Sequence, residues 1–239
     1  MSRSESVVYG IHAALALAKH RPKAIHRVHF LPENKKVLGP LFKATAAQKR
    51  PYRQGEANDL DKISGTVHHE GVVVVADPLP TYPVGPRRTF LNESKRIIAL
   101  DGVTNPHNVG AIIRSMAWFG CDALLVNNGH PSVNPAAVRI SQGGAETVPC
   151  IRTPKLMETI GWLREHNFTV LAADQNGKKL TQDLRQIERL CLVLGSETRG
   201  LSQAVARACT QRISIPGTGA VESLNVSVAA SVLMALSQP

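Results

Sequence analysis

The C-terminal segment 212–237 places opposed structural demands on one stretch of chain. Its first four residues follow a short strand pattern. Pro216 and two glycines then interrupt regular structure and let the backbone approach a ligand closely. From Ser223 and Asn225 onward, small apolar residues predict a helix whose first N–H groups need partners. This order is typical of a ligand site in an α/β protein, although an ordinary strand-to-helix connection with a good cap has the same pattern.

Strand and helix patterns alternate along the whole chain, which predicts an α/β fold. A run of four prolines and one glycine between residues 77 and 88 argues against regular structure there and indicates a semi-rigid linker. We therefore expect an N-terminal domain of residues 1–77, a linker of residues 78–94 and a C-terminal domain of residues 95–239. In the C-terminal domain the loop 101–110 is expected to lead into a helix over 111–119.

The charge of the chain points to a polyanionic partner. It has 28 Lys and Arg against 18 Asp and Glu, a formal net charge of +10. Residues 1–77 carry 12 cations and 7 anions, so the remaining 16 and 11 also give +5. The basic surface thus belongs to both halves, although a merely solvated basic face is the alternative. Aromatic residues make up only 4%, so phosphate and sugar contacts are expected to dominate over base stacking.

Several classes of protein are disfavoured by what the sequence lacks. No apolar run reaches the roughly 18 residues of a membrane span, and the first six residues form no apolar signal core. The four cysteines lie far apart, and neither they nor the histidines have a metal-ligand spacing. We therefore expect a cytoplasmic protein with reduced, buried thiols, no membrane contact and no metal.

Three loops in the C-terminal half share one design, an apolar strand followed by a glycine-containing polar loop and a helix. They span residues 101–114, 195–202 and 215–225. In an open parallel sheet such loops converge on one crevice at the carboxyl ends of the strands. No GxxxxGK[ST] occurs and no GxGxxG follows a strand, which disfavours nucleotide triphosphatases and nicotinamide enzymes. Their polar side chains are Asn105, His107, Asn108, Arg114, Glu197, Arg199, Ser223 and Asn225.

The three loops closely resemble the three motifs of the SpoU (TrmH-like) family of RNA ribose 2′-O-methyltransferases, in the SPOUT superfamily. The matching segments are 100–115, 192–202 and 212–237. Residues 8–14 and the sequence His69-Glu-Gly-Val72 also resemble the family's L30e-like domain, with Glu70 where the family has Gln. Within the family, the chain looks most like the bacterial enzymes that methylate a guanosine ribose of 23S rRNA, and their paralogues.

This resemblance implies a specific architecture and activity. The C-terminal SPOUT domain would have a parallel sheet flanked by helices and a deep C-terminal trefoil knot, beside an L30e-like α/β domain that binds the RNA substrate. The cofactor would be S-adenosylmethionine, and the substrate a ribose 2′-hydroxyl in structured RNA, rRNA rather than tRNA. The family is dimeric, so a homodimer with the active site at or near the subunit interface is expected.

The resemblance also assigns roles in the cofactor site. It gives backbone contacts to Gly195, Ile215 and Leu224. Backbone groups of glycine loops can hold the adenine and methionine parts of the cofactor without long side chains. Weaker candidates beside these three residues are Ser196, Gly200 and Ser223.

Arg114 is the first catalytic candidate. A guanidinium stays protonated, so we expect Arg114 to hold the neighbouring phosphate and orient the 2′-hydroxyl while a phosphate oxygen or water takes the proton. A solvated helix arginine is the alternative. Asn108 would position Arg114 or the ribose, or else cap a helix. Glu197 would fix Arg114 or Asn108, or else act as a first-turn acid. Ser223 and Asn225 would line the methyl-transfer site, or only cap the last helix.

Two other functions remain open from sequence. A catalytically weak or inactive SPOUT-fold protein that binds RNA or assists ribosome assembly would keep the fold, although Asn108, Arg114, Glu197, Ser223 and Asn225 are all intact. Base methylation by another SPOUT branch is disfavoured, because the motifs resemble those of the ribose-specific branch.

Overall fold

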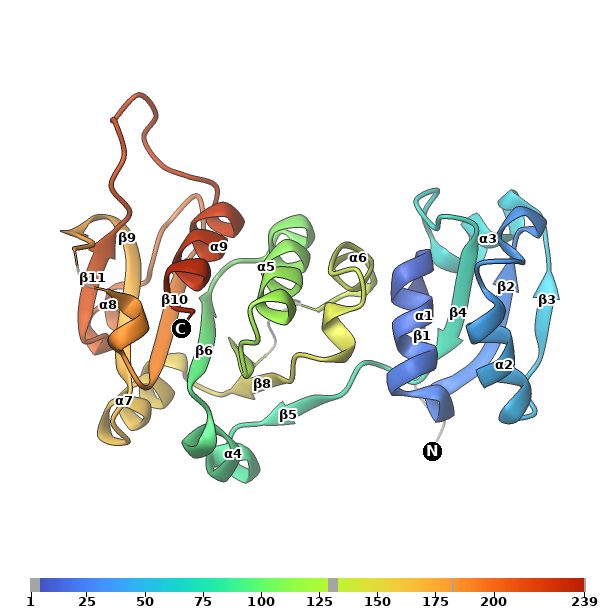
Figure 1. The fold of residues 1–239 in the computed structure, drawn as a ribbon, viewed down its shortest axis with the longest axis horizontal. Helices are drawn as coiled ribbons and strands as arrows, with labels where there is room; N and C mark the ends of the chain where they lie inside the picture. Colours follow the sequence, from blue (N-terminus) through green and yellow to red (C-terminus); the bar gives the residue numbers. More distant parts are fainter. Residues whose placement is uncertain (1–4, 129–132, 182, 239) are drawn as a thin grey trace.

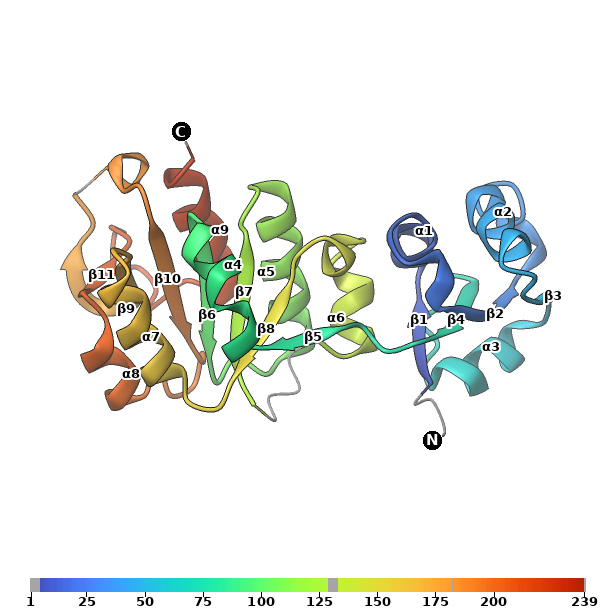
Figure 2. The ribbon, with the colours of Figure 1, turned by 90° about the horizontal axis from the view of Figure 1, so that it is seen from below.

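The computed structural model describes residues 5–128, 133–181 and 183–238. The chain forms two α/β parts arranged along the long axis of the molecule (Figures 1 and 2). The N-terminal part has a four-stranded sheet in the order β1-β4-β2-β3, and the C-terminal part a seven-stranded sheet in the order β11-β9-β10-β6-β7-β8-β5. This arrangement confirms the predicted α/β class with a parallel sheet flanked by helices. The trefoil knot and the functional limits 1–77, 78–94 and 95–239 stay predictions.

The N-terminal sheet is built around β4, whose five residues are all buried, as its run of four valines predicts. β1 and β2 flank it antiparallel, and β3 is an edge strand parallel to β2. The elements of this part are β1 (Ser6–Tyr9), α1 (Ile11–His20), η1 (Pro22–Ala24), β2 (Ile25–Phe30), η2 (Pro32–Asn34), α2 (Gly39–Ala47), β3 (Tyr52–Gln54), α3 (Ala57–Ser64) and β4 (Val72–Ala76).

The seven-stranded sheet carries helices on both faces, and every described strand pairing in it is parallel. Its elements are β5 (Thr81–Pro83), η3 (Gly85–Arg87), α4 (Arg88–Glu93), β6 (Arg96–Asp101), α5 (Pro106–Trp118), β7 (Ala123–Asn127), α6 (Pro135–Ile140), η4 (Gly144–Glu146), β8 (Cys150–Thr153), α7 (Leu156–Glu165), β9 (Thr169–Lys179), η5 (Leu184–Gln186), β10 (Leu190–Gly195), α8 (Gln203–Ala208), β11 (Gln211–Ser214) and α9 (Val226–Leu236).

Alternation along the central strands divides the core between the two faces. In β6, Ile98 and Leu100 pack in one apolar cluster with buried residues of α5 and α9. Ile97 and Ala99 point the other way, into a second cluster with residues of α4, α7 and α8. Figure 2 shows the sheet between these two helix layers. The parallel strands therefore end at one common edge, where the polar loops follow.

The proline-rich stretch is more ordered than expected. Thr81–Pro83 forms β5, which pairs with β8 at the outer edge of the large sheet, and α4 follows directly. The expectation of no regular structure was therefore wrong. Proline is tolerated in an edge strand because one side of the strand needs no ladder hydrogen bond. The stretch thus belongs in part to the C-terminal sheet.

The helix predicted over 111–119 begins five residues earlier, at Pro106. Asn105 is its N-cap, and the Asn105 side chain accepts a hydrogen bond from the backbone N–H of His107 at 2.9 Å. Proline at the first helical position has a preset φ and needs no donor there, so Asn-Pro starts a helix instead of breaking one. Asn108 consequently lies inside the helix and does not cap it.

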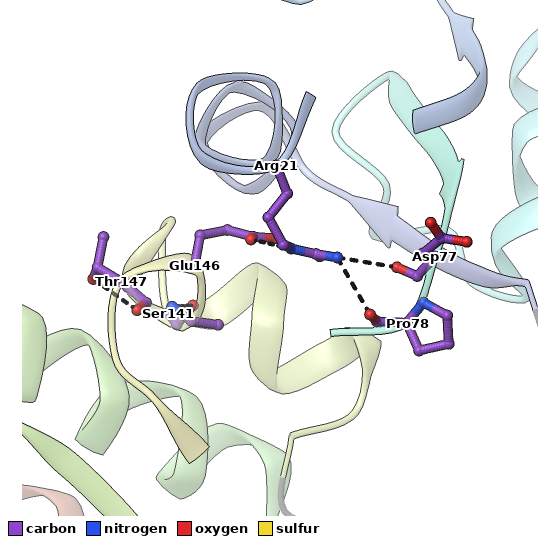
Figure 3. A network of polar contacts seen from close by, with 8 residues as sticks. Arg21, Asp77, Pro78, Ser141, Glu146 and Thr147 are labelled. Carbon is purple, nitrogen blue, oxygen red and sulfur yellow. Dashed lines mark hydrogen bonds and ion pairs between the residues drawn. The ribbon is translucent and has the colours of Figure 1, made fainter. Parts of the chain in front are cut away.

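A polar network joins the two parts of the molecule (Figure 3). The Arg21 guanidinium donates to both carboxylate oxygens of Glu146, at 2.6 and 2.9 Å, and to the backbone carbonyls of Asp77 and Pro78, at 3.3 and 3.2 Å. The Glu146 side chain is only 1% exposed. Because apolar residues of α1 belong to the same buried cluster as α5, the two parts share a continuous core.

All four cysteines are buried, in agreement with the expected buried thiols. Burial raises the pKa of Cys121 to about 12 and that of Cys209 to about 11, so both stay protonated and unreactive near neutral pH. Within the described ranges, no helix has the length and apolarity to cross a membrane. The same ranges contain no cluster of three or more His, Cys, Asp or Glu side chains that could hold a metal ion.

Candidate active site

The first two polar loops leave neighbouring strands and are tied together at their base. Gly195, at the end of β10, lies in register with Asp101, at the end of β6. The Asp101 carboxylate accepts a hydrogen bond from the backbone N–H of Ser202 at 2.7 Å, closing the second loop against the first. Sequence reasoning assigned Asp101 no role. Its position directly after an apolar strand was the available signal.

Asn225 joins all three loops through one side-chain amide. Its Nδ2 donates to Oδ1 of Asn108, at 3.0 Å, and to Oε1 of Glu197, at 2.6 Å. Its Oδ1 accepts from the backbone N–H and the hydroxyl of Ser227, at 2.9 and 2.6 Å. Asn225 is therefore both the N-cap of α9 and the contact between the loops. The capping role expected from the sequence is therefore present, and the role of Asn225 at the methyl-transfer site stays a prediction.

The partners of Asn225 differ in burial. Asn108 is 6% exposed, and its side-chain oxygen takes its hydrogen bond from Asn225. Glu197 is exposed, and its carboxylate oxygen accepts from the same amide. Among the described contacts, Glu197 bonds to Asn225, which in turn bonds to Asn108, and the expectation that Glu197 fixes Arg114 or Asn108 stays a prediction. We call Asn108, Glu197 and Asn225 the amide junction.

The second loop folds back tightly on itself. The backbones of Ser196 and Gly200 exchange two hydrogen bonds of 3.1 and 2.8 Å, and the Ser196 hydroxyl accepts from the N–H of Arg199 at 3.1 Å. Gly200 has a φ of +63°, which favours glycine. A Cβ on Gly195 would collide with the backbone of Gly200. The loop thus presents bare backbone at the carboxyl edge of the sheet.

The third loop, residues 215–225, projects beyond the sheet between β11 and α9 (Figure 1). Ile215 packs partly against the core, whereas Ser223 and Leu224 are exposed. Ser223 forms no hydrogen bond with any described residue. The Gln175 amide donates to Glu222 at 3.2 Å, connecting the loop to β9. This loop offers exposed apolar and backbone groups beside the amide junction.

Arg114 lies apart from the amide junction within one chain. It follows Asn108 by six residues on α5, which places it about 9 Å further along the helix and on another side. Its side chain is exposed and pairs with no described residue. Trp118, one turn further on the same side of the helix, is 84% exposed. The structure therefore brings together Asn108, Glu197 and Asn225, but not Arg114.

Comparisons with known proteins agree along the whole chain. Residues 95–235 match the SpoU rRNA Methylase family, and residues 7–82 match the family described as RNA 2′-O ribose methyltransferase substrate binding. The chain is 32% identical to the 23S rRNA (guanosine-2′-O-)-methyltransferase RlmB of Escherichia coli K12 over 233 residues, covering 95% of this chain and 96% of that protein. The Salmonella typhimurium protein of the same name gives the same identity and coverage.

Solved structures show the same fold. A putative RNA methyltransferase of the TrmH family from Porphyromonas gingivalis matches with a TM-score of 0.74 and 25% identity, over 98% of this chain and 89% of that chain. The SpoU methyltransferase AviRb from Streptomyces viridochromogenes, solved in complex with AdoMet, matches with a TM-score of 0.76 and 24% identity, over the same shares of the two chains.

A parallel sheet with three polar loops at its carboxyl edge, beside a substrate-binding domain, defines an S-adenosylmethionine-dependent RNA ribose 2′-O-methyltransferase. The chain belongs to the SpoU rRNA Methylase family, as the motif resemblance indicated.

The described loops fit S-adenosylmethionine, the cofactor of the family. An adenosine with an amino-acid tail needs backbone hydrogen-bonding groups and apolar contacts, and no metal. The bare backbone around Gly195 and Gly200 supplies the hydrogen-bonding groups. Ile215 and Leu224, which is 46% exposed, supply the apolar contacts. When bound, this cofactor supplies an electrophilic methyl group on a sulfonium. The chain's own residues have to orient the accepting hydroxyl and remove its proton.

Proposed function

We propose that this enzyme methylates the ribose 2′-hydroxyl of a guanosine in 23S rRNA and acts in the cytoplasm, where that RNA is assembled. The amide junction carries the proposal, because it keeps the three family loops together around Asn225. The names of the RlmB relatives, which match over nearly their full length, support the substrate. The net charge of +10 supports a phosphate-led interaction with RNA.

In the proposed site the roles follow from position. The backbone at Gly195, Ile215 and Leu224, with Ser196, Gly200 and Ser223 beside it, would hold the cofactor. The amide junction would set the relative position of the loops and place Ser223 and Asn225 beside the ribose. Positioning of two reactants can supply several kcal/mol of the barrier, so this role needs no acid or base among these residues.

Arg114 would grip the phosphate next to the reacting ribose and orient its hydroxyl, with a phosphate oxygen or water as proton acceptor. Because Arg114 lies apart from its own chain's amide junction, we propose that it acts at the site of a second copy in a homodimer. The exposed side of α5 and α9 supports this arrangement. Besides Arg114, these two helices, which the Ser115–Ser231 hydrogen bond joins, carry the exposed apolar residues Trp118, Val228 and Leu236, a set we call the α5–α9 face.

The test is methylation of 23S rRNA isolated from cells that lack the protein, with tritiated S-adenosylmethionine and mapping of ribose methylation. We expect one 2′-O-methylguanosine, formed by the wild type and not by Asn225→Ala. Methyl transfer to tRNA alone, or to a base, would contradict the proposed substrate. Cofactor binding in calorimetry without transfer to any RNA would instead favour the RNA-binding or assembly alternative.

A further inference from the structure

A chain of three aromatic rings runs from the core of the N-terminal domain to its surface. The ring centroids of Phe30 and Phe42 lie 4.6 Å apart, and those of Phe42 and Tyr52 lie 5.0 Å apart with a 22° angle between the planes. Phe30 is buried, whereas Tyr52 is 47% exposed. One face of the Tyr52 ring rests on Phe42, so the exposed surface belongs to its opposite face and edge.

Tyr52 lies on β3, a strand that contributes no buried residue to the core. All three residues of this strand are exposed, and among the described residues no further strand pairs with its outer edge. A strand with one face packed against the core would alternate buried and exposed residues. An aromatic side chain on such a strand is instead available to a partner.

Cations lie next to Tyr52 along the chain, although strand alternation places Arg53 on the opposite face of β3. Lys49 and Arg50 precede Tyr52 and Arg53 follows it, and all three are exposed. Their side chains pair with no described carboxylate, unlike Arg27 on the neighbouring strand, which pairs with Glu5 at 3.1 Å. Burial, Arg27 and Arg53 lower the pKa of His29 against an opposing effect of Asp59, which places Arg53 near His29.

We propose that Tyr52 is a stacking platform for one unpaired base of the RNA, with Lys49 and Arg50 on the adjacent phosphates. Stacking on an exposed aromatic ring needs a base freed from its helix, and cations near the ring hold the RNA backbone next to that base. This inference rests on the proposed RNA substrate and specifies how the N-terminal domain recognises it.

The platform lies far from the amide junction. β3 forms the end of the molecule away from the seven-stranded sheet (Figures 1 and 2). A base held there is therefore a different nucleotide from the one methylated. The platform would recognise an unpaired nucleotide that lies at a fixed distance from the methylated one. It would not bind the methylated nucleotide itself.

The experiment compares full-length variants on two RNA probes, a single-stranded 12-nucleotide oligoadenylate and a blunt 12-base-pair RNA duplex. Tyr52→Phe keeps the ring, Tyr52→Leu keeps apolar volume without it, and Tyr52→Ala removes both. We expect Leu and Ala to weaken binding of the single strand on the order of 10-fold, the loss of one stacked base, and Phe to change it less than about twofold. Duplex binding should change less than about twofold in all three.

Replacing a flanking cation should affect RNA binding differently from replacing the ring. Arg50→Ala should weaken binding of both probes and lower the salt dependence of binding, because phosphate contacts release counterions. Arg185→Ala, an exposed arginine paired with Asp183 in the other domain, is the matched control and should leave both affinities unchanged. Unchanged circular dichroism melting checks that each variant is folded.

Equal loss of both probes in Tyr52→Leu, or no loss of either, would overturn the stacking platform. The first result would indicate a structural role for the ring, and the second a site unrelated to RNA, such as an acidic protein surface. Neither result bears on methyl transfer by the wild type, which tests the proposed function separately.

Discussion

At the scale of single residues, replacing Arg114 should reduce methyl transfer without affecting the fold. Because its side chain is exposed and unpaired among the described residues, Arg114→Ala should leave the fold and the affinity for S-adenosylmethionine unchanged. Methyl transfer should fall on the order of 100-fold or more, the loss typical of one well-placed electrostatic group. Arg114→Lys should recover little, since Lys lacks the planar fork. Single-turnover methylation beside calorimetry measures both; a near-normal rate in Arg114→Ala would make Arg114 an ordinary surface cation.

Asn225 has two functions that two substitutions can separate. Asn225→Asp keeps an acceptor for the N–H groups that begin α9 but cannot donate to Asn108, and places a second carboxylate beside Glu197. Asn225→Ala also loses the cap, which costs about 1 kcal/mol. We expect both to weaken cofactor binding, and the Ala variant alone to lose the stability of the cap. Urea unfolding and calorimetry provide the comparison, and normal cofactor affinity in both variants would remove the amide junction from the site.

The residue scale also shows what the sequence could and could not predict. The motifs identified Asn108, Glu197 and Asn225, which the fold brings into contact. They did not predict that one amide connects all three, because that depends on the packing of α9 beside α5. Glu70, where the resemblance leads one to expect Gln, illustrates the same limit. Its carboxylate accepts from Arg139, at 3.2 Å, and from the N–H of Ile11, contacts that only the folded chain reveals.

At the scale of elements, Gly110 sets how closely α5 and α6 approach. A Cβ there would lie 2.6 Å from Cβ of Ile140 and 2.7 Å from the carbonyl oxygen of Ala137. Gly110→Ala gains about 1 kcal/mol of helix propensity but pays for overpacking by about 1–3 kcal/mol, so we expect net destabilisation. Gly161→Ala is the matched control, because α7 leaves that position open, and should stabilise the protein by about 0.5–1 kcal/mol. Urea denaturation measures both; stabilisation in Gly110→Ala would show that the helices move apart freely.

The predicted element boundaries were wrong where one sequence pattern is compatible both with a loop and with a helix start. Asn-Pro at 105–106 was assigned to a loop, but it starts α5, and the same pair at 134–135 starts α6. The apolar strand signals were reliable because both faces of the large sheet are covered. β3 and β5 gave no such signal, since edge strands bury little.

At the scale of the whole molecule, the Arg21–Glu146 ion pair fixes the two domains against each other. Arg21→Ala leaves the Glu146 carboxylate buried without its partner, so the free energy of unfolding should fall by about 2 kcal/mol, less than for a fully buried pair. Adding Glu146→Ala should recover part of this loss. Arg27→Ala, whose pair with Glu5 is half exposed, should cost less than about 1 kcal/mol. Equal costs for Arg21 and Arg27 in urea unfolding would show that the domains are not held by this contact.

The relative placement of the domains was beyond sequence reasoning. Arg21 and Glu146 are 125 residues apart, and no periodic pattern links them. The proline-rich stretch indicated a linker, whereas contacts such as Gly143 against Ala16 leave no room for a side chain between the domains.

The proposed homodimer makes a prediction about which chain supplies Arg114. Light scattering should give the mass of two chains, and Val228→Glu on the α5–α9 face should reduce it to one.

If Arg114 serves the site of the partner, a dimer of one Arg114→Ala chain and one Asn225→Ala chain has one complete site. Co-expression with two affinity tags and random pairing should then restore about a quarter of wild-type activity, because half of the twofold-symmetric dimers are mixed and each has one site of two. If Arg114 serves its own chain, every site carries a substitution and the mixture stays as inactive as either variant. A monomeric mass for the wild type would contradict the homodimer and the site completed by the partner.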